Sequence, residues 1–264
     1  MILKSKNAIV YGGGGAIGSA VAIAFAREGA KVFLAGRSSR KLELVKERII
    51  QQGGSAEVGV VDTTNAKDVE RHFRSIEAEG IRIHISFNAT GIPQTGIQGI
   101  KLLDLTDDQV LYPMIQYTKS NFLTARAAAR HMVLNNSGVI MMLTAPPSKI
   151  SAPNVGGMAP TWASIEAFTR TFATEFGASG VRVVCLRPDG IPESDTITEV
   201  YGLHARANGI DSHLGVQQYM ENLTLLKRLP TLMQVANTAV FIASDWAGAI
   251  TGSVVNLSCG SVVD

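Results

Sequence analysis

A chain of 264 residues is long enough for one large α/β domain or two small ones. Hydrophobic residues make up 46% of the sequence and charged residues only 17%, so a sizeable core can be buried and general disorder is excluded. The net charge of +2 lacks the basic excess of proteins that bind nucleic acid, so small molecules are the expected ligands.

The first strand and helix form an apolar N-terminal stretch that resembles a targeting segment. Residues 7–26 carry no charge and follow Lys4 and Lys6, as in a signal peptide or membrane span. Five glycines within this stretch would break an apolar helix, which argues against both. Cys185 and Cys259 form no C-x-x-C pair, so neither a disulfide framework nor a metal site is predicted. We therefore expect a cytoplasmic protein that does not associate with membranes.

Short β-rich runs alternate with helical patterns along the chain, which is typical of β/α units around a parallel sheet. We predict a single domain over residues 1–264, with a Rossmann-like, doubly wound fold in which helices cover both faces of a seven-stranded parallel sheet. The predicted strands are residues 7–10, 31–35, 56–61, 81–88, 138–143, 181–186 and 254–257. The predicted helices lie near residues 16–28, 40–51, 65–79, 107–134, 161–178 and 231–244.

Residues 191–228 fall outside this alternation and are predicted to form a mobile lobe that covers a substrate site. Four side chains of this lobe have the chemistry to deliver a proton once the lobe closes, although each is more often an ordinary lid residue: Tyr201, His204, His213 and Tyr219.

A glycine-rich turn connects the first strand to the first helix. Gly13, Gly15 and Gly18 satisfy the pattern G-x-G-x-x-G in the strand–turn–helix setting that binds a dinucleotide. Glycines let backbone N–H groups approach a pyrophosphate at the positive end of the following helix. The alternative is a merely flexible turn. The predicted cofactor contacts in this segment are Gly12, Gly14, Gly15, Ile17 and Gly18.

The end of the second strand indicates which dinucleotide is bound. An NAD site would place Asp or Glu there to accept from the ribose 2′-OH, and residues 29–42 contain no acid. Arg37 and Ser38 instead offer a cation and a hydroxyl that suit a 2′-phosphate. NADP(H) is therefore favoured over NAD(H). The alternative is that this stretch is only the solvated start of a helix.

Several motifs in order resemble the short-chain dehydrogenase/reductase family over nearly the entire chain. The family's T-G-x-x-x-G-x-G motif is matched by residues 11–18, with Tyr11 in place of Thr and Ala16 in place of Gly. Asp62 is similar to the family's adenine-contacting acid, and residues 88–91 are similar to its N-N-A-G turn. The resemblance implies an oxidoreductase that assembles as a homotetramer or homodimer. It also implies further cofactor contacts at Asp62, Thr63, Asn88, Ala89, Thr90, Pro188 and Gly190.

The family's catalytic residues do not match. Alignment with the family places Ala145 at its catalytic Ser, Met158 at its Tyr and Trp162 at its Lys. Tyr117 takes the position of its structural Asn, and with the enoyl reductase spacing the Tyr position falls on Val155. Because Met158 has no proton to give and Trp162 carries no charge, the family's usual proton transfer is not available to these residues.

Other groups are candidates for a replacement proton donor. Tyr117 is the first hypothesis, because its helix borders the active site in the family, although a surface or interface tyrosine is the alternative. Ser148 and Lys149 follow the fifth strand, but Pro146 and Pro147 leave their direction unreadable. In the nearby turn of residues 187–191, Asp189 replaces a family glycine beside the nicotinamide.

Two functions are consistent with this sequence. The first is an NADP(H)-dependent oxidoreductase that acts on a small carbonyl or enoyl substrate with a non-standard proton donor. An enoyl substrate needs less of an acid, because its enolate is stabilised by its own carbonyl. The second is a catalytically inactive nucleotide-binding sensor or scaffold with the same fold.

Overall fold

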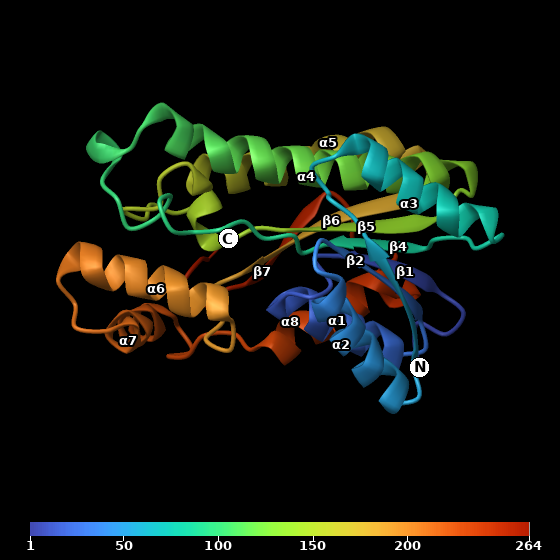
Figure 1. Cartoon of the computed structure of the whole chain (residues 1–264), viewed down its shortest axis with the longest axis horizontal. Helices are drawn as coiled ribbons and strands as arrows, with labels where there is room; N and C mark the ends of the chain where they lie inside the picture. Colours follow the sequence, from blue (N-terminus) through green and yellow to red (C-terminus); the bar gives the residue numbers. More distant parts are fainter. Residues whose placement is uncertain (264) are drawn as a thin grey trace.

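A computed structural model describes residues 1–263 of the chain, and it confirms the predicted parallel sheet (Figure 1). Within these residues, seven strands lie in the order β3-β2-β1-β4-β5-β6-β7, and every neighbouring pair is parallel. The order reverses between β1 and β4, which creates the crevice where ligands bind in doubly wound sheets. The strands are β1 Asn7–Tyr11, β2 Lys31–Gly36, β3 Ser55–Val60, β4 Ile85–Asn88, β5 Gly138–Leu143, β6 Val181–Pro188 and β7 Ser253–Leu257.

Helices cover both faces of the sheet, as the sequence predicts (Figure 1). One face carries α1 Ala16–Arg27, α2 Ser39–Gln51 and α8 Leu232–Ala243. The other face carries α3 Ala66–Ala78, α4 Asp107–Leu134 and α5 Met158–Phe176. Successive residues of a strand point to opposite faces. In β1, Ala8 and Val10 therefore join the core under α1, while Ile9 and Tyr11 join the core under α3 and α4.

Two element boundaries differ from the predicted ones by three residues or more. β4 begins at Ile85 rather than at residue 81, because the backbone N–H of Asn7 donates to Nδ1 of His84 (3.0 Å) instead of to a strand carbonyl. α5 begins at Met158 rather than at residue 161. Pro160 lies in its first turn, where a missing N–H costs no hydrogen bond. Met158 and Trp162 are consequently one helical turn apart on the same helix.

Residues 191–228, the predicted lobe, contain two helices that lie beside the sheet (Figure 1). Its helices are α6 Asp195–Asn208 and α7 His213–Leu223, which share a small apolar cluster around Tyr201 and Val216. The lobe is tied to the segment after β4. Thr95 donates both its N–H (3.0 Å) and its hydroxyl (2.7 Å) to Oε1 of Glu199.

Among the helices of residues 1–263, none combines the length and the apolar character that crossing a membrane requires.

His72 makes the stability of the fold sensitive to pH. Its ring, on α3, lies where a Cβ on Gly59 would be, 2.4 Å from Nε2, and makes an edge contact with Tyr11. Burial lowers the pKa of His72 from 6.5 to about 4. Between these values the folded protein binds fewer protons than the unfolded chain. The stabilisation is therefore complete above pH 6.5 and is lost as pH falls towards 4.

We therefore expect the free energy of unfolding to depend less steeply on pH in His72→Gln than in the wild type. Urea denaturation at pH 7.5, 6, 5 and 4.5 measures this dependence. His213→Gln, which removes a histidine of the lobe, is the control. The same slope in His72→Gln and the wild type would contradict the assignment.

Candidate functional site

The glycine turn after β1 is packed so closely that side chains are excluded. Gly12 has a φ of +72°, and a Cβ on it would lie 2.5 Å from the carbonyl oxygen of Ala89. A Cβ on Gly18 would lie 2.2 Å from the carbonyl oxygen of Gly12. These contacts press the start of α1 and the segment after β4 against the turn. The predicted residues Gly12, Gly18 and Ala89 thus meet at the crevice between β1 and β4.

The N-terminus of α1 is open to a ligand. Gly15 is its N-cap and supplies no side-chain hydrogen bond, and the first turn contains no acidic residue. Gly15 is exposed, and Gly14 and Ile17 are partly exposed. Free N–H groups at a positive helix end bind anions. With the close approach at Gly12 and Gly18, this cradle fits the pyrophosphate of a dinucleotide.

Asp62 provides a carboxylate near the end of β3. Its Oδ1 accepts the hydroxyl (2.7 Å) and the N–H (2.9 Å) of Thr64. These hydrogen bonds, and more weakly the charges of Arg37 and Lys119, lower the pKa of Asp62. Lys119 lies on α4 and belongs to no motif, so the sequence alone did not indicate its proximity to Asp62.

Arg37 and Ser38 are both exposed at the end of β2. The hydroxyl of Ser38 caps α2 by accepting the N–H of Lys41 (3.5 Å) and keeps its own proton to donate. The first turn of α2 contains no acidic residue that would repel a phosphate.

Asn88 and Thr63 are held in a buried polar network. Nδ2 of Asn88 donates to the hydroxyls of Ser120 (3.2 Å) and Thr124 (2.9 Å), and Ser120 donates to the hydroxyl of Thr63 (2.9 Å). Oδ1 of Asn88 accepts the N–H of Thr90 (2.9 Å). Asn88 and Thr63 thus brace the segments after β4 and β3. The hydroxyl of Thr90 is buried without a partner among residues 1–263, and a bound cofactor would supply one.

The turn after β6 carries Pro188, Asp189 and Gly190. Asp189 accepts the N–H of Gly190 (2.7 Å) and the hydroxyl of Ser261, and burial raises its pKa. A Cβ on Gly190 would lie 2.0 Å from the hydroxyl of Tyr201, so α6 packs directly on this turn. The carboxylate of Asp189 is therefore engaged with its own turn and with the segment after β7.

Two of the aligned catalytic positions, Met158 and Trp162, lie in one apolar cluster. Ala145 directly follows Thr144 at the end of β5, and Met158 and Trp162 lie on the first turns of α5. Ile97, Val155 and Met158 are buried together, and Tyr117 and Trp162 pack against them. The hydroxyl of Tyr117 is the acidic group of these side chains, and burial raises the pKa of Tyr117 to about 12.

The other proposed donors lie in different surroundings. Ser148 donates to Oε1 of Glu166 (2.5 Å), and Lys149 is exposed just after it. In the lobe, Nε2 of His204 lies 3.2 Å from Oε1 of Gln98, and burial lowers the pKa of His204. Tyr219 is exposed on α7, and His213 begins that helix. The hydroxyl of Tyr201, another lobe candidate, packs against Gly190 in the turn after β6.

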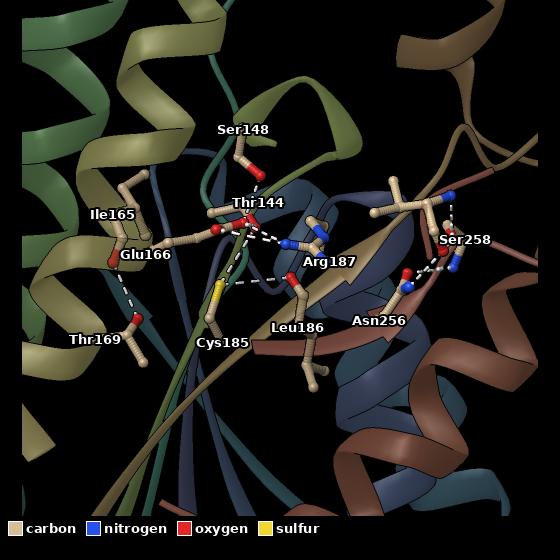
Figure 2. A network of polar contacts seen from close by, with 11 residues as sticks. Thr144, Ser148, Ile165, Glu166, Thr169, Cys185, Leu186, Arg187, Asn256 and Ser258 are labelled. Carbon is tan, nitrogen blue, oxygen red and sulfur yellow. Dashed lines mark hydrogen bonds and ion pairs between the residues drawn. The ribbon is translucent and has the colours of Figure 1, made fainter. Parts of the chain in front are cut away.

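A buried polar network, which no motif in the sequence indicates, surrounds Glu166. Figure 2 shows Glu166, on α5, pointing towards Arg187 on β6, with Thr144 and Ser148 beside it. Glu166 and Arg187 are 21 residues apart and fit no motif, so no pattern in the sequence connects them. Among residues 1–263, no group of His, Cys, Asp and Glu has the arrangement of a metal site.

The fold and the glycine cradle define a dinucleotide-binding α/β protein, and comparison with known proteins identifies its family. Residues 14–261 match a family model described as enoyl-(acyl carrier protein) reductase. The chain belongs to the short-chain dehydrogenase/reductase family of oxidoreductases.

Similar proteins span the full chain. An uncharacterized oxidoreductase of Thermotoga maritima is 28% identical and covers 99% of both sequences. The structure of NAD⁺-bound xylitol dehydrogenase has a TM-score of 0.92 and is 21% identical, covering 98% of this chain and 100% of its own. A gluconate 5-dehydrogenase from Burkholderia cenocepacia, in complex with NADP and tartrate, has a TM-score of 0.85 and is 22% identical, covering 98% and 95%. The likeness to these two structures concerns the fold, and their cofactors differ.

Proposed function

We propose that this protein is an NADP(H)-dependent oxidoreductase that acts on a small carbonyl or enoyl substrate and uses a non-standard proton donor. The observation that carries the proposal is the glycine cradle, in which Gly12 and Gly18 leave no room for a Cβ and the N-terminus of α1 is open. A merely flexible turn would not pack its glycines this closely against neighbouring backbone.

The choice of NADP(H) rests on the surroundings of Asp62. Arg37 lies near enough to Asp62 to lower the pKa of that carboxyl. Arg37 and Ser38 are both exposed, and the first turn of the adjacent helix α2 contains no acidic residue. An arginine binds phosphate oxygens through two parallel charge-assisted hydrogen bonds. A ribose 2′-phosphate would find these donors, whereas a bare 2′-OH would find no carboxylate in residues 29–42.

Each part of the site has a different proposed role in the reaction. The bound cofactor supplies a hydride donor or acceptor. The cradle holds its pyrophosphate, and Asn88 fixes the segments that flank it. The cluster of Ile97, Val155 and Met158 excludes water from the reacting end.

Tyr117 is the proposed proton donor. Because burial raises its pKa to about 12, it stays protonated over the ordinary pH range and can donate to an alkoxide or enolate oxygen. We expect Tyr117→Phe to lower kcat about tenfold, below the usual range for a general acid, because water also protonates an enolate. Steady-state rates measure this effect, with Lys149→Met as the parallel test of the second candidate. Wild-type rates in Tyr117→Phe would remove Tyr117 from the mechanism.

The proposed function is tested by NADPH fluorescence on binding, followed by turnover with a panel of ketones, quinones and enoyl thioesters. We expect NADPH to bind and at least one acceptor to be reduced. Tight binding without oxidation of NADPH by any acceptor would contradict the proposed oxidoreductase activity and favour a nucleotide sensor.

We also propose a homodimer or homotetramer. Leu111, Tyr112 and Ile115 expose apolar surface on one stretch of α4, which a second copy would cover. Sedimentation at micromolar concentration tests this assembly, and a monomer would contradict it.

A further inference from the structure

A buried carboxylate connects three separate segments of the chain (Figure 2). Glu166 is 8% exposed and Arg187 is 2% exposed. Oε1 of Glu166 accepts the hydroxyl of Thr144 (3.1 Å) and the hydroxyl of Ser148 (2.5 Å). Nη1 of Arg187 lies 3.4 Å from the same oxygen. Donors from the segment after β5 and from the end of β6 thus converge on one atom of α5.

The donors around Glu166 stabilise its carboxylate in a buried position. A buried carboxylate is costly unless hydrogen bonds and a cation satisfy it, and here both are present. The thiol of Cys185 lies 3.3 Å from the hydroxyl of Thr144, and burial raises the pKa of Cys185 to about 12. The thiol therefore stays neutral, and Glu166 is the anion around which these groups are arranged.

The network joins the two segments that flank the reacting end of the site. Thr144 and Ser148 lie on either side of Ala145, the aligned position of the family's catalytic serine. Arg187 directly precedes the turn of Pro188 and Gly190, the expected neighbour of the nicotinamide. Both segments leave the carboxyl ends of adjacent parallel strands, where ligands bind in this class of sheet.

We propose that Glu166 is a positioning residue that holds the segments after β5 and β6 at a fixed separation, so that they form two walls around the nicotinamide half of the cofactor. In the aligned family, the serine, tyrosine and lysine positions carry the polar groups of this region. In this chain, those positions are Ala145, Met158 and Trp162, and the polar network is centred on Glu166, one helical turn after Trp162 on α5. This inference rests on the proposed binding of NADP(H).

The experiment compares two ligands by calorimetry. NADPH contains the nicotinamide, whereas adenosine 2′,5′-bisphosphate contains only the adenosine half with its 2′-phosphate. We expect Glu166→Gln to bind NADPH about tenfold more weakly, the effect of losing one charge-assisted hydrogen bond, and to bind the bisphosphate as the wild type does. The fluorescence of NADPH at saturation should also change, because it reports the surroundings of the nicotinamide ring.

Two further variants complete the design. Glu175→Gln makes the same change at an exposed position of α5 and should match the wild type with both ligands. Ser148→Ala removes one hydrogen bond, keeps the pair of Glu166 and Arg187, and should weaken NADPH binding less than Glu166→Gln. If Glu166→Gln does not fold, Ser148→Ala carries the test alone.

The outcomes separate this inference from the proposed function. Equal weakening of both ligands, or unchanged NADPH binding and fluorescence in Glu166→Gln and Ser148→Ala, would overturn the positioning role while NADP(H) binding stands. If the wild type binds neither ligand, the proposed function fails and this inference fails with it.

Discussion

Gly12→Ala is expected to weaken NADPH binding by at least about 100-fold, which corresponds to roughly 2.7 kcal/mol. The new Cβ would lie 2.5 Å from the carbonyl oxygen of Ala89, and the φ of +72° disfavours any L side chain. The positive φ alone costs about 1–2 kcal/mol, and the contact must be relieved by moving the turn away from the segment after β4. The N–H groups that face the pyrophosphate then lose their arrangement. Calorimetric titration with NADPH measures the loss.

Gly53→Ala is the matched control for Gly12→Ala. Gly53 has a φ of +79°, and a Cβ on it would have no heavy atom within 4 Å. This variant therefore carries the backbone strain without the steric contact, and it lies between α2 and β3, away from the cradle. We expect reduced thermal stability with unchanged NADPH affinity. If Gly12→Ala also retained its affinity, the turn would not be the binding site for the cofactor.

Arg37→Ala is expected to weaken NADPH binding about 10- to 100-fold and to leave NADH binding unchanged. The expected loss is that of one or two charge-assisted hydrogen bonds to the 2′-phosphate. NADH has no such phosphate, so the ratio of the two dissociation constants isolates the contribution of Arg37. High salt should reduce the difference, because Arg37 is exposed and its charge is screened.

Arg40→Ala, an exposed cation on the first turn of α2, is the control for Arg37→Ala. A loss confined to Arg37→Ala supports a specific phosphate contact, and equal losses in both variants would indicate only a general basic surface. Equal loss of NADPH and NADH affinity in Arg37→Ala would contradict the preference for NADP(H).

The fold was predictable because its signals are local. Strand and helix patterns alternate along the chain, and the glycine turn combines a strand, a tight turn and a helix within a dozen residues. The first residues of β4 and α5 were harder to predict from the sequence. The first depends on the side chain of His84, which reaches Asn7 on a neighbouring strand. The second depends on whether Pro160 lies inside a first helical turn or before it.

The site was predictable only in part, for a physical reason. The cradle lies within one short segment, so its residues could be named from sequence. The pair of Glu166 and Arg187 depends on how α5 is rotated against β6, which no spacing in the sequence reveals. The hydrogen bonds of Asn88 and Thr63 were not predictable either, because their partners Ser120 and Thr124 lie on helix α4, distant in the sequence. Their direct contact with a cofactor remains a prediction.

The bonds between Thr95 and Glu199, and between Gln98 and His204, make the lobe and the segment after β4 one mechanical unit. Glu199 and Thr95 are separated by 104 positions in sequence, yet α6 cannot swing outward without pulling residues 95–98 with it or breaking these bonds. Since Ile97 in that segment belongs to the apolar cluster around Met158, an outward movement of α6 would also displace one side of that cluster. Grafting a relative's lobe onto this chain would thus require grafting the matching stretch after β4 as well.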